Sequence, residues 1–136
     1  MKLRLLGFTL MELLVVVIIV ALLALLAIPI YSNYLTYSRR TDAIQTLSAI
    51  QVAEESYRLT NNTYGTLAQV WSGSSSVSSY YTIAISNVTA SSYTITATAV
   101  SSQANDDQNG TSCASMVLAF ANNATTKTPA VCWSMS

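Results

Sequence analysis

The stretch that decides the fold is Gly7-Phe8-Thr9-Leu10-Met11-Glu12, followed by the run LLVVVIIVALLALLAIPI at positions 13–30. The run contains 18 residues without a polar side chain, which is about the shortest length for a helix that crosses a bilayer. Glu12 stands at its head, although a carboxylate inside a membrane costs about 2.5–3.5 kcal/mol on insertion scales. We therefore expect Glu12 to have a function that offsets this cost.

The residues before this stretch are few and basic. Lys2 and Arg4 are expected to hold the N-terminus on the cytoplasmic side of a membrane. A single-pass anchor with a cytoplasmic N-terminus is therefore one interpretation. A secretory signal with a cleavage site near Ala27 is another, but Pro29 and the polar and aromatic residues after it make this the weaker one.

The composition restricts the possible functions. The chain has 136 residues, of which 51% are hydrophobic and 9% are charged, and its formal net charge is zero. Charge alone does not attract such a chain strongly to nucleic acid. Because the sequence contains no histidine, Ser-His and Cys-His nucleophiles and His-ligated zinc sites are excluded. We expect no enzymatic activity, no cofactor and no metal site.

A second helical pattern follows the apolar run, between Arg39 and Leu59. Apolar residues recur there at spacings of three and four, as in an amphipathic helix: Ala43, Leu47, Ile50, Ala53 and Tyr57. The polar positions are Arg40, Asp42, Gln45, Glu54, Glu55 and Arg58. We expect one long helix from Phe8 to Leu59 with a bend near Pro29, whose ring removes a helix hydrogen bond. Arg39 and Arg40 are expected on a solvated face or in a contact between subunits.

The residues after the helix predict a small β-rich head. A connecting loop is expected over residues 60–79, and it includes the Ser-rich segment 72–76. Alternating and β-branched residues predict three strands, at 80–85, 93–98 and 115–122. In the third strand, Met116, Leu118 and Phe120 share one face. An antiparallel sheet packed on the amphipathic helix gives an α+β fold.

Cys113 and Cys132 are the two cysteines of the chain. An exported head with almost no lysine favours a disulfide between them. The bridge would close a 20-residue loop around the third strand and stabilise the fold by roughly 3 kcal/mol. Two free buried thiols are the alternative.

An oxygen-rich turn lies before the first cysteine. It contains Asp106, Asp107 and Asn109, whose side chains are of the type that binds calcium. The spacing does not match an EF-hand loop, so we expect a solvated turn.

The leader ending in Gly7, the motif Phe8-Thr9-Leu10-x-Glu12 and the later Pro29 together resemble the N-terminal signal of type IV pilins and the related pseudopilins. The resemblance is specific over the first 30 or so residues and looser beyond them. It implies that a prepilin peptidase cleaves between Gly7 and Phe8 and then N-methylates Phe8. It also implies that Glu12 of one subunit pairs with the N-terminal amine of another, since a buried charge must be paired. In such assembly helices, Pro29 would lie in a curved segment.

The resemblance divides the chain into four parts. These are a cleaved leader at 1–7, a hydrophobic transmembrane and assembly helix at 8–37, an amphipathic half of the helix at 38–60, and a globular β head with a C-terminal disulfide loop at 61–136. Such a protein is a single-pass, lipid-embedded protein of the bacterial inner membrane before assembly and part of an extracellular filament afterwards. Its implied partners are further copies of the same or other pilins, the prepilin peptidase and the inner-membrane assembly platform.

The implied function is that of a structural subunit, major or minor, of a type IV pilus that serves adhesion, motility or DNA uptake. A pseudopilin of a type II secretion system is an alternative, although the C-terminal disulfide favours a pilin. A DNA-binding pilin for natural transformation is a further alternative. Its support is weak, because the head and the end of its helix carry only Arg58 and Lys127 as cations. Removal of the leader would leave four basic and six acidic side chains, a side-chain charge of −2.

Overall fold

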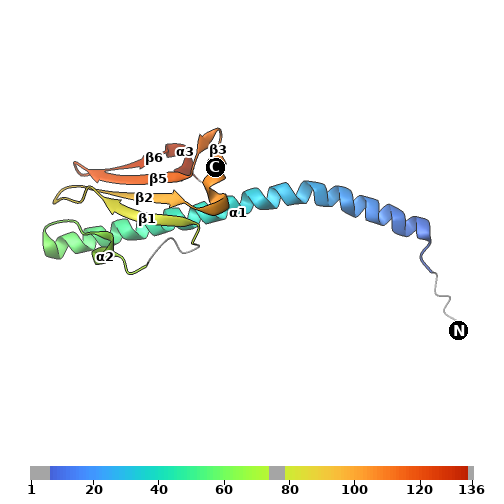
Figure 1. The fold of residues 1–136 in the computed structure, drawn as a ribbon, viewed down its shortest axis with the longest axis horizontal. Coiled ribbons are helices and arrows are strands. Elements are labelled where there is room, and N and C mark those ends of the chain that lie inside the picture. The colour runs from blue at the N-terminus through green and yellow to red at the C-terminus, as the bar shows by residue number, and fades with distance from the viewer. Residues whose placement is uncertain (1–6, 74–78, 135–136) are drawn as a thin grey trace. The chain divides into compact units, whose positions relative to one another are not determined.

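The computed structural model describes residues 7–73 and 79–134 of the chain. The predicted leader, apart from Gly7, and residues 74–76 of the Ser-rich segment lie outside the described residues. The chain divides into two compact units, Met1–Leu35 and Thr36–Ser136 (Figure 1).

The longest element is the helix α1, Leu10–Asn61, which contributes to both units. It was predicted between Phe8 and Leu59, so the prediction is confirmed to within two residues at each end. The N-terminal part of α1 makes up the described helix of the first unit, and its C-terminal part belongs to the second unit.

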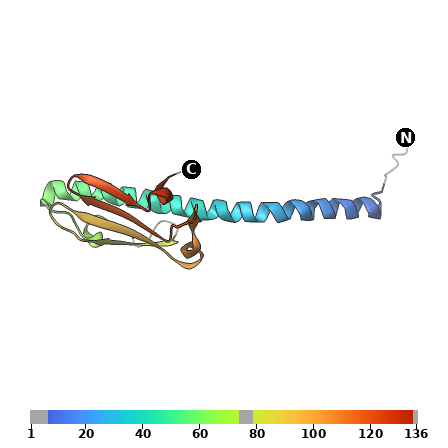
Figure 2. The ribbon, with the colours of Figure 1, turned by 90° about the horizontal axis from the view of Figure 1, so that it is seen from above.

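The main sheet of the second unit has four strands in the order β1-β2-β5-β6, and all neighbouring strands are antiparallel. The strands are β1 Tyr81–Ser86, β2 Tyr93–Ala99, β5 Ser115–Ala121 and β6 Ala124–Thr128. Figures 1 and 2 show the sheet lying along the C-terminal part of α1. The first three strands confirm the three predicted ones, and the helix and sheet together confirm the predicted α+β fold.

Strand β6 was not predicted from the sequence. Its five residues are all exposed, so they lack the alternation of buried apolar and exposed polar side chains that signals a strand. Its position comes from pairing with β5, in which Leu118 faces Lys127 across the ladder. Strand β6 therefore forms only when the folded chain places β5 beside it.

Five short elements complete the second unit. They are α2 Leu67–Val70, the 3-10 helix η1 Ser101–Asn105, the paired strands β3 Asp107–Gln108 and β4 Thr111–Ser112, and α3 Ala130–Trp133. The first of them lies in the segment that was predicted as a connecting loop. None of the five carries a periodic sequence pattern, because each is five residues or shorter.

The core of the second unit lies between α1 and the sheet. On the helix, Ala43, Leu47 and Ile50 are fully buried, at the spacing predicted for an amphipathic face. The inward residues of β1, β2 and β5 cover them and alternate as expected for strands: Tyr81, Ile83, Tyr93, Ile95, Ala97, Met116 and Leu118. An aromatic cluster adds to this core, in which the ring centroids of Tyr64 and Tyr93 lie 4.6 Å apart.

The polarity of the helix positions was predicted incorrectly at two residues. Arg40 and Glu54, expected among the exposed polar positions, are 5% and 0% exposed. The expected core positions Ala53 and Tyr57 are only half-buried. The reason is that the second unit supplies polar partners for Arg40 and Glu54, and sequence periodicity does not record such partners.

Candidate functional site

The N-terminal end of α1 is held by Thr9. The backbone N–H of Glu12 donates to Thr9 Oγ1 at 3.2 Å, and the N–H of Leu13 donates to the Thr9 carbonyl at 3.2 Å. This Thr-x-x-Glu spacing is that of a capping box. The carboxylate of Glu12 in the first turn also faces the positive end of the helix dipole. The arrangement gives Glu12 a place in starting the helix as well as its predicted role in assembly.

The predicted site residues Gly7, Phe8 and Glu12 lie together at this end of α1. Gly7 and Phe8 precede the first helical residue, and Phe8 is 76% exposed. Pro29 lies inside the same helix, and the hydroxyl of Ser32 donates to the Pro29 carbonyl at 2.9 Å. Their predicted roles in cleavage, methylation and assembly remain predictions.

The helix surface between Leu13 and Ile30 is apolar on all sides. Every large hydrophobic side chain in this segment is at least 45% exposed within the chain. Among the described residues, α1 is the one helix long and apolar enough to cross a membrane. Such a surface needs lipid or another subunit to cover it.

A buried polar cluster joins α1 to η1, to β3 and to the disulfide. Its centre is an ion pair in which Arg40 Nε lies 3.5 Å from Asp106 Oδ2, with side chains only 6% and 2% exposed. The guanidinium Nη1 of Arg40 also donates to Gln108 Oε1 and, at 3.0 Å, to Cys113 Sγ. One helix side chain thus contacts the residue before β3, a residue within β3 and the disulfide.

Gln103 on η1 closes the cluster from the other side. Its Nε2 lies 3.0 Å from the Thr36 carbonyl, 3.1 Å from Tyr81 Oη and 3.1 Å from Asp106 Oδ2. Burial raises the pKa of Tyr81 to about 12. Burial also raises the pKa of Asp106, although the neighbouring Arg40 acts to lower it. The cluster is therefore structural, and it fastens η1 to α1.

The turn at 106–109 was expected to be solvated, and this is wrong for Asp106. Its carboxylate is turned inward onto Arg40 and is 4% exposed as a residue. Asp107 is exposed, and its Oδ1 accepts a hydrogen bond from the Gly110 N–H at 2.9 Å. Asp106 therefore belongs to a buried ion pair, whereas Asp107 stabilises a local turn. Sequence reasoning missed the cluster because its members come from distant segments without a shared spacing.

The predicted disulfide between Cys113 and Cys132 is confirmed, with an S–S distance of 2.03 Å. It links the residue after β4 to α3 and encloses both β5 and β6. The two sulfur-bearing residues are 0% and 1% exposed. The bridge therefore ties the end of the chain to the segment that Arg40 also binds.

A second buried acid lies farther along α1. Glu54 is fully buried, and its Oε2 accepts a hydrogen bond from the Gly65 N–H at 2.8 Å. Its Oε1 has no hydrogen-bond partner among the described residues. Burial raises the pKa of the Glu54 carboxyl. A Cβ on Gly65 would lie 2.6 Å from Val70 Cγ1, so a larger residue there would require the Val70 side chain to move.

Replacing Glu54 with Gln should flatten the pH dependence of stability. Burial raises the pKa of Glu54 in the folded state above its ordinary value of 4.5, so the wild-type chain loses stability as the pH rises from about 4.5 through the folded-state pKa. Gln keeps an acceptor for Gly65 and has no charge to bury. Urea unfolding of the detergent-solubilised chain, followed by Trp fluorescence, measures this. The control is Glu55→Gln, which removes an exposed charge that contributes less than burial to the raised pKa of Glu54 and should therefore have a smaller effect. An equal effect there would contradict the assignment.

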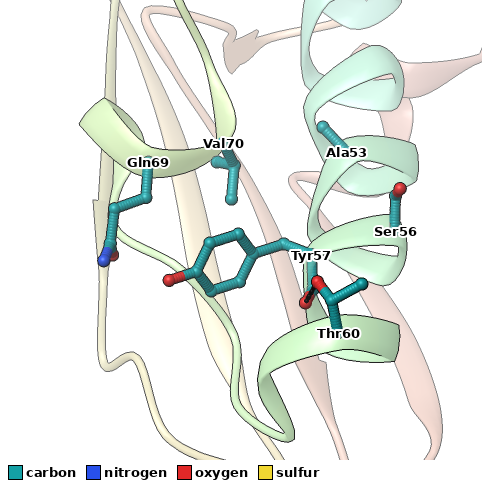
Figure 3. Close-up of a pocket in the computed structure, with 6 residues that line it drawn as sticks. All are labelled: Ala53, Ser56, Tyr57, Thr60, Gln69 and Val70. Carbon is teal, nitrogen blue, oxygen red and sulfur yellow. Dashed lines mark hydrogen bonds between the residues drawn. The ribbon is translucent and has the colours of Figure 1, made fainter.

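A shallow groove of about 310 Å³ runs between α1 and α2. It is lined by Ala53, Ser56, Tyr57, Thr60, Gln69 and Val70. Figure 3 shows Tyr57 reaching from α1 toward Gln69 and Val70. All the lining residues are uncharged, so the groove offers hydroxyl and amide groups and no attraction for phosphate.

The cations of the second unit are mostly engaged with aromatic rings. The guanidinium carbon of Arg39 lies 3.8 Å from the Tyr80 ring centroid, and Arg58 donates to Tyr64 Oη at 2.9 Å. Lys127 lies on the exposed strand β6, with its Nζ 5.1 Å from the Trp133 ring centroid. Among the described residues of this unit, Lys127 is the one cation whose side chain is exposed. Arg40 is buried, and the other two arginines are half-buried.

Comparison with known proteins places these features in a family. A family model described as type IV minor pilin ComP, DNA uptake sequence receptor, matches residues 29–117. No curated protein matches the chain. The matched segment holds most of the described sheet and the buried cluster. Of the residues on which the pilin resemblance rested, it includes Pro29 and none of the motif between Gly7 and Glu12. Because the match covers more than half of the chain, the protein belongs to this family of type IV minor pilins.

Proposed function

We propose that this chain is a minor pilin that takes part in DNA uptake. The observation that carries the proposal is the family match over residues 29–117, whose description names a receptor for DNA uptake sequences. The apolar and exposed first half of α1 supports insertion into a membrane and then into a filament. The chain would act by binding and assembly and not as an enzyme.

The proposal includes a route from membrane to filament. A prepilin peptidase cleaves between Gly7 and Phe8 and N-methylates Phe8, and the chain then waits in the inner membrane with its N-terminus in the cytoplasm. The assembly platform inserts it among other pilins, where Glu12 meets the amine of a neighbouring Phe8 and Pro29 permits the helix to curve. Sequencing the N-terminus of membrane-extracted protein tests this route. N-methylated Phe8 is expected, whereas a retained Met1 or a cut after Ala27 would contradict it.

Replacing Glu12 with Ala should abolish incorporation into filaments while leader removal continues. The reason is that the charged amine of the neighbouring subunit loses its partner in an apolar setting. The measurement is the amount of the chain in sheared filaments relative to the membrane fraction. Thr9→Ala is the matched control, since it weakens the cap of α1 by about 1 kcal/mol without removing a charge. Equal incorporation of Glu12→Ala and wild type would remove the assigned role.

DNA binding by this chain should depend only weakly on salt. Each neutralised phosphate contributes a slope of about −0.9 to the logarithmic plot of affinity against salt concentration. With Lys127 as the exposed cation of the described second unit, we expect a slope of about −1 to −2. Titration of full-length protein with duplex DNA at several salt concentrations measures this slope.

Substitution of Lys127 tests where the DNA lies. Lys127→Gln should reduce the magnitude of the slope by about 1, and Thr125→Ala on the same strand should leave it unchanged. If Lys127→Gln has no effect, the DNA binds away from β6. If the protein has no measurable affinity for any duplex, and deletion of its gene leaves DNA uptake intact, the proposed function is wrong.

A further inference from the structure

Two tyrosines follow directly on the apolar run of α1. Tyr31 and Tyr34 are three residues apart in the helix, so their side chains lie on neighbouring positions of one face. Each is 64% exposed. Ile30 is the last residue of the apolar run before them, and the polar residues Ser32 and Asn33 lie between them.

The length of the apolar run places these tyrosines at a defined depth. The 18 residues at positions 13–30 span about 27 Å at the rise of an α-helix. The hydrocarbon core of a bilayer is about 30 Å thick. When the run fills that core, Tyr31 and Tyr34 therefore lie at its boundary with the lipid headgroups.

The chemistry of the two side chains fits that boundary. A tyrosine ring is apolar and its hydroxyl is polar, and such side chains are enriched where hydrocarbon meets headgroups. In the described part of the chain, neither hydroxyl has a hydrogen-bond partner. Two tyrosines of the second unit differ, since Tyr64 and Tyr81 are buried and hydrogen-bonded.

We propose that Tyr31 and Tyr34 form an interfacial anchor that binds the headgroup region of a phospholipid bilayer. The anchor sets the depth of the apolar helix before the chain enters a filament. It concerns the end of the span opposite Glu12, and it does not depend on any role in DNA uptake. A neighbouring pilin subunit is the other possible cover for this face, and the experiment separates the two.

The test measures the depth of position 34 in vesicles. The full-length chain carries Tyr34→Trp with Trp71→Phe and Trp133→Phe, and it is reconstituted in vesicles of phosphatidylethanolamine and phosphatidylglycerol. Lipids with a quencher at the headgroup, or deep in the acyl chain, are added in turn. We expect the shallow quencher to act more strongly at position 34. The matched control, Leu22→Trp in the same background, should be quenched mainly by the deep label.

Two results would overturn the proposal. One is stronger quenching of position 34 by the deep label, which would put the tyrosines inside the hydrocarbon. The other is the absence of quenching by either lipid, which would mean that protein or water covers this face. In the Leu22→Trp background, Tyr31→Ala with Tyr34→Ala should also abolish the difference between deep and shallow quenching, because the helix loses its fixed depth.

A second measurement avoids the tryptophan replacements. The wild-type chain is labelled with 3-fluorotyrosine, and Tyr31→Phe and Tyr34→Phe assign the two ¹⁹F resonances. A headgroup spin label should broaden these two resonances and leave those of the buried Tyr81 and Tyr93 sharp. Unbroadened resonances of Tyr31 and Tyr34 would contradict the anchor independently of the quenching result.

Discussion

Replacing Arg40 with Ala is expected to reduce the free energy of unfolding of the Thr36–Ser136 unit by about 3–5 kcal/mol at neutral pH. The change leaves the Asp106 carboxylate buried without its cation, and it removes the donor to Gln108 and Cys113. The penalty of an unpaired buried charge is larger than the net value of the pair. Urea unfolding of the detergent-solubilised chain, followed by the fluorescence of Trp71 and Trp133, provides the measurement.

Two controls separate charge from packing. Arg39→Ala removes only a half-buried guanidinium stacked on Tyr80, so the expected loss is about 0.5–1 kcal/mol. The double variant Arg40→Met with Asp106→Leu removes both charges together and should recover much of the lost stability. If Arg40→Ala cost no more than Arg39→Ala, the ion pair would have no structural role.

The effect of Arg40→Ala should also depend on pH. Burial raises the pKa of Asp106 in the folded state above its ordinary value of 3.8, so this group destabilises the fold increasingly as the pH rises from about 3.8 through the folded-state pKa. Arg40 acts to lower that pKa, and its removal raises it further. The difference between variant and wild type should therefore be largest at neutral pH and smallest near pH 4. A difference that is constant over this range would contradict the mechanism.

Removing the disulfide is expected to cost about 3 kcal/mol of the free energy of unfolding. The double variant Cys113→Ala with Cys132→Ala frees a loop that holds both β5 and β6, so the unfolded chain gains conformational entropy. The same urea experiment measures the loss. Wild-type protein in reductant controls for the packing of the two side chains, and it should unfold at a similarly lowered urea concentration.

The disulfide and the ion pair should not act independently. Arg40 Nη1 lies 3.0 Å from Cys113 Sγ, and residues in one network rarely give additive effects. The loss of unfolding free energy in the triple variant should therefore differ measurably from the sum of the losses caused by Arg40→Ala and by the two cysteine replacements. Simple additivity would show that the contact carries no coupling.

Sequence patterns were sufficient to predict those helices and strands whose apolar residues recur with the period of the element. The apolar run and the spacing of Ala43, Leu47 and Ile50 predicted α1 almost to its ends, and alternation predicted β1, β2 and β5. Strand β6 could not be predicted in this way, because all five of its residues are exposed and only pairing with β5 orders it. The disulfide was predictable because the chain has only two cysteines to pair.

The sequence by itself determined the apolar helix, the acid at its head and the class of fold, because these depend on periodicity and on a local motif. Only the tertiary structure decided the fate of Arg40 and Glu54, which share the polar spacing of exposed helix residues and yet are buried. Burial of a charge depends on whether a partner arrives from elsewhere in the chain. Here the partners are Asp106, 66 residues away from Arg40, and the backbone of Gly65 for Glu54, and no local pattern encodes either contact.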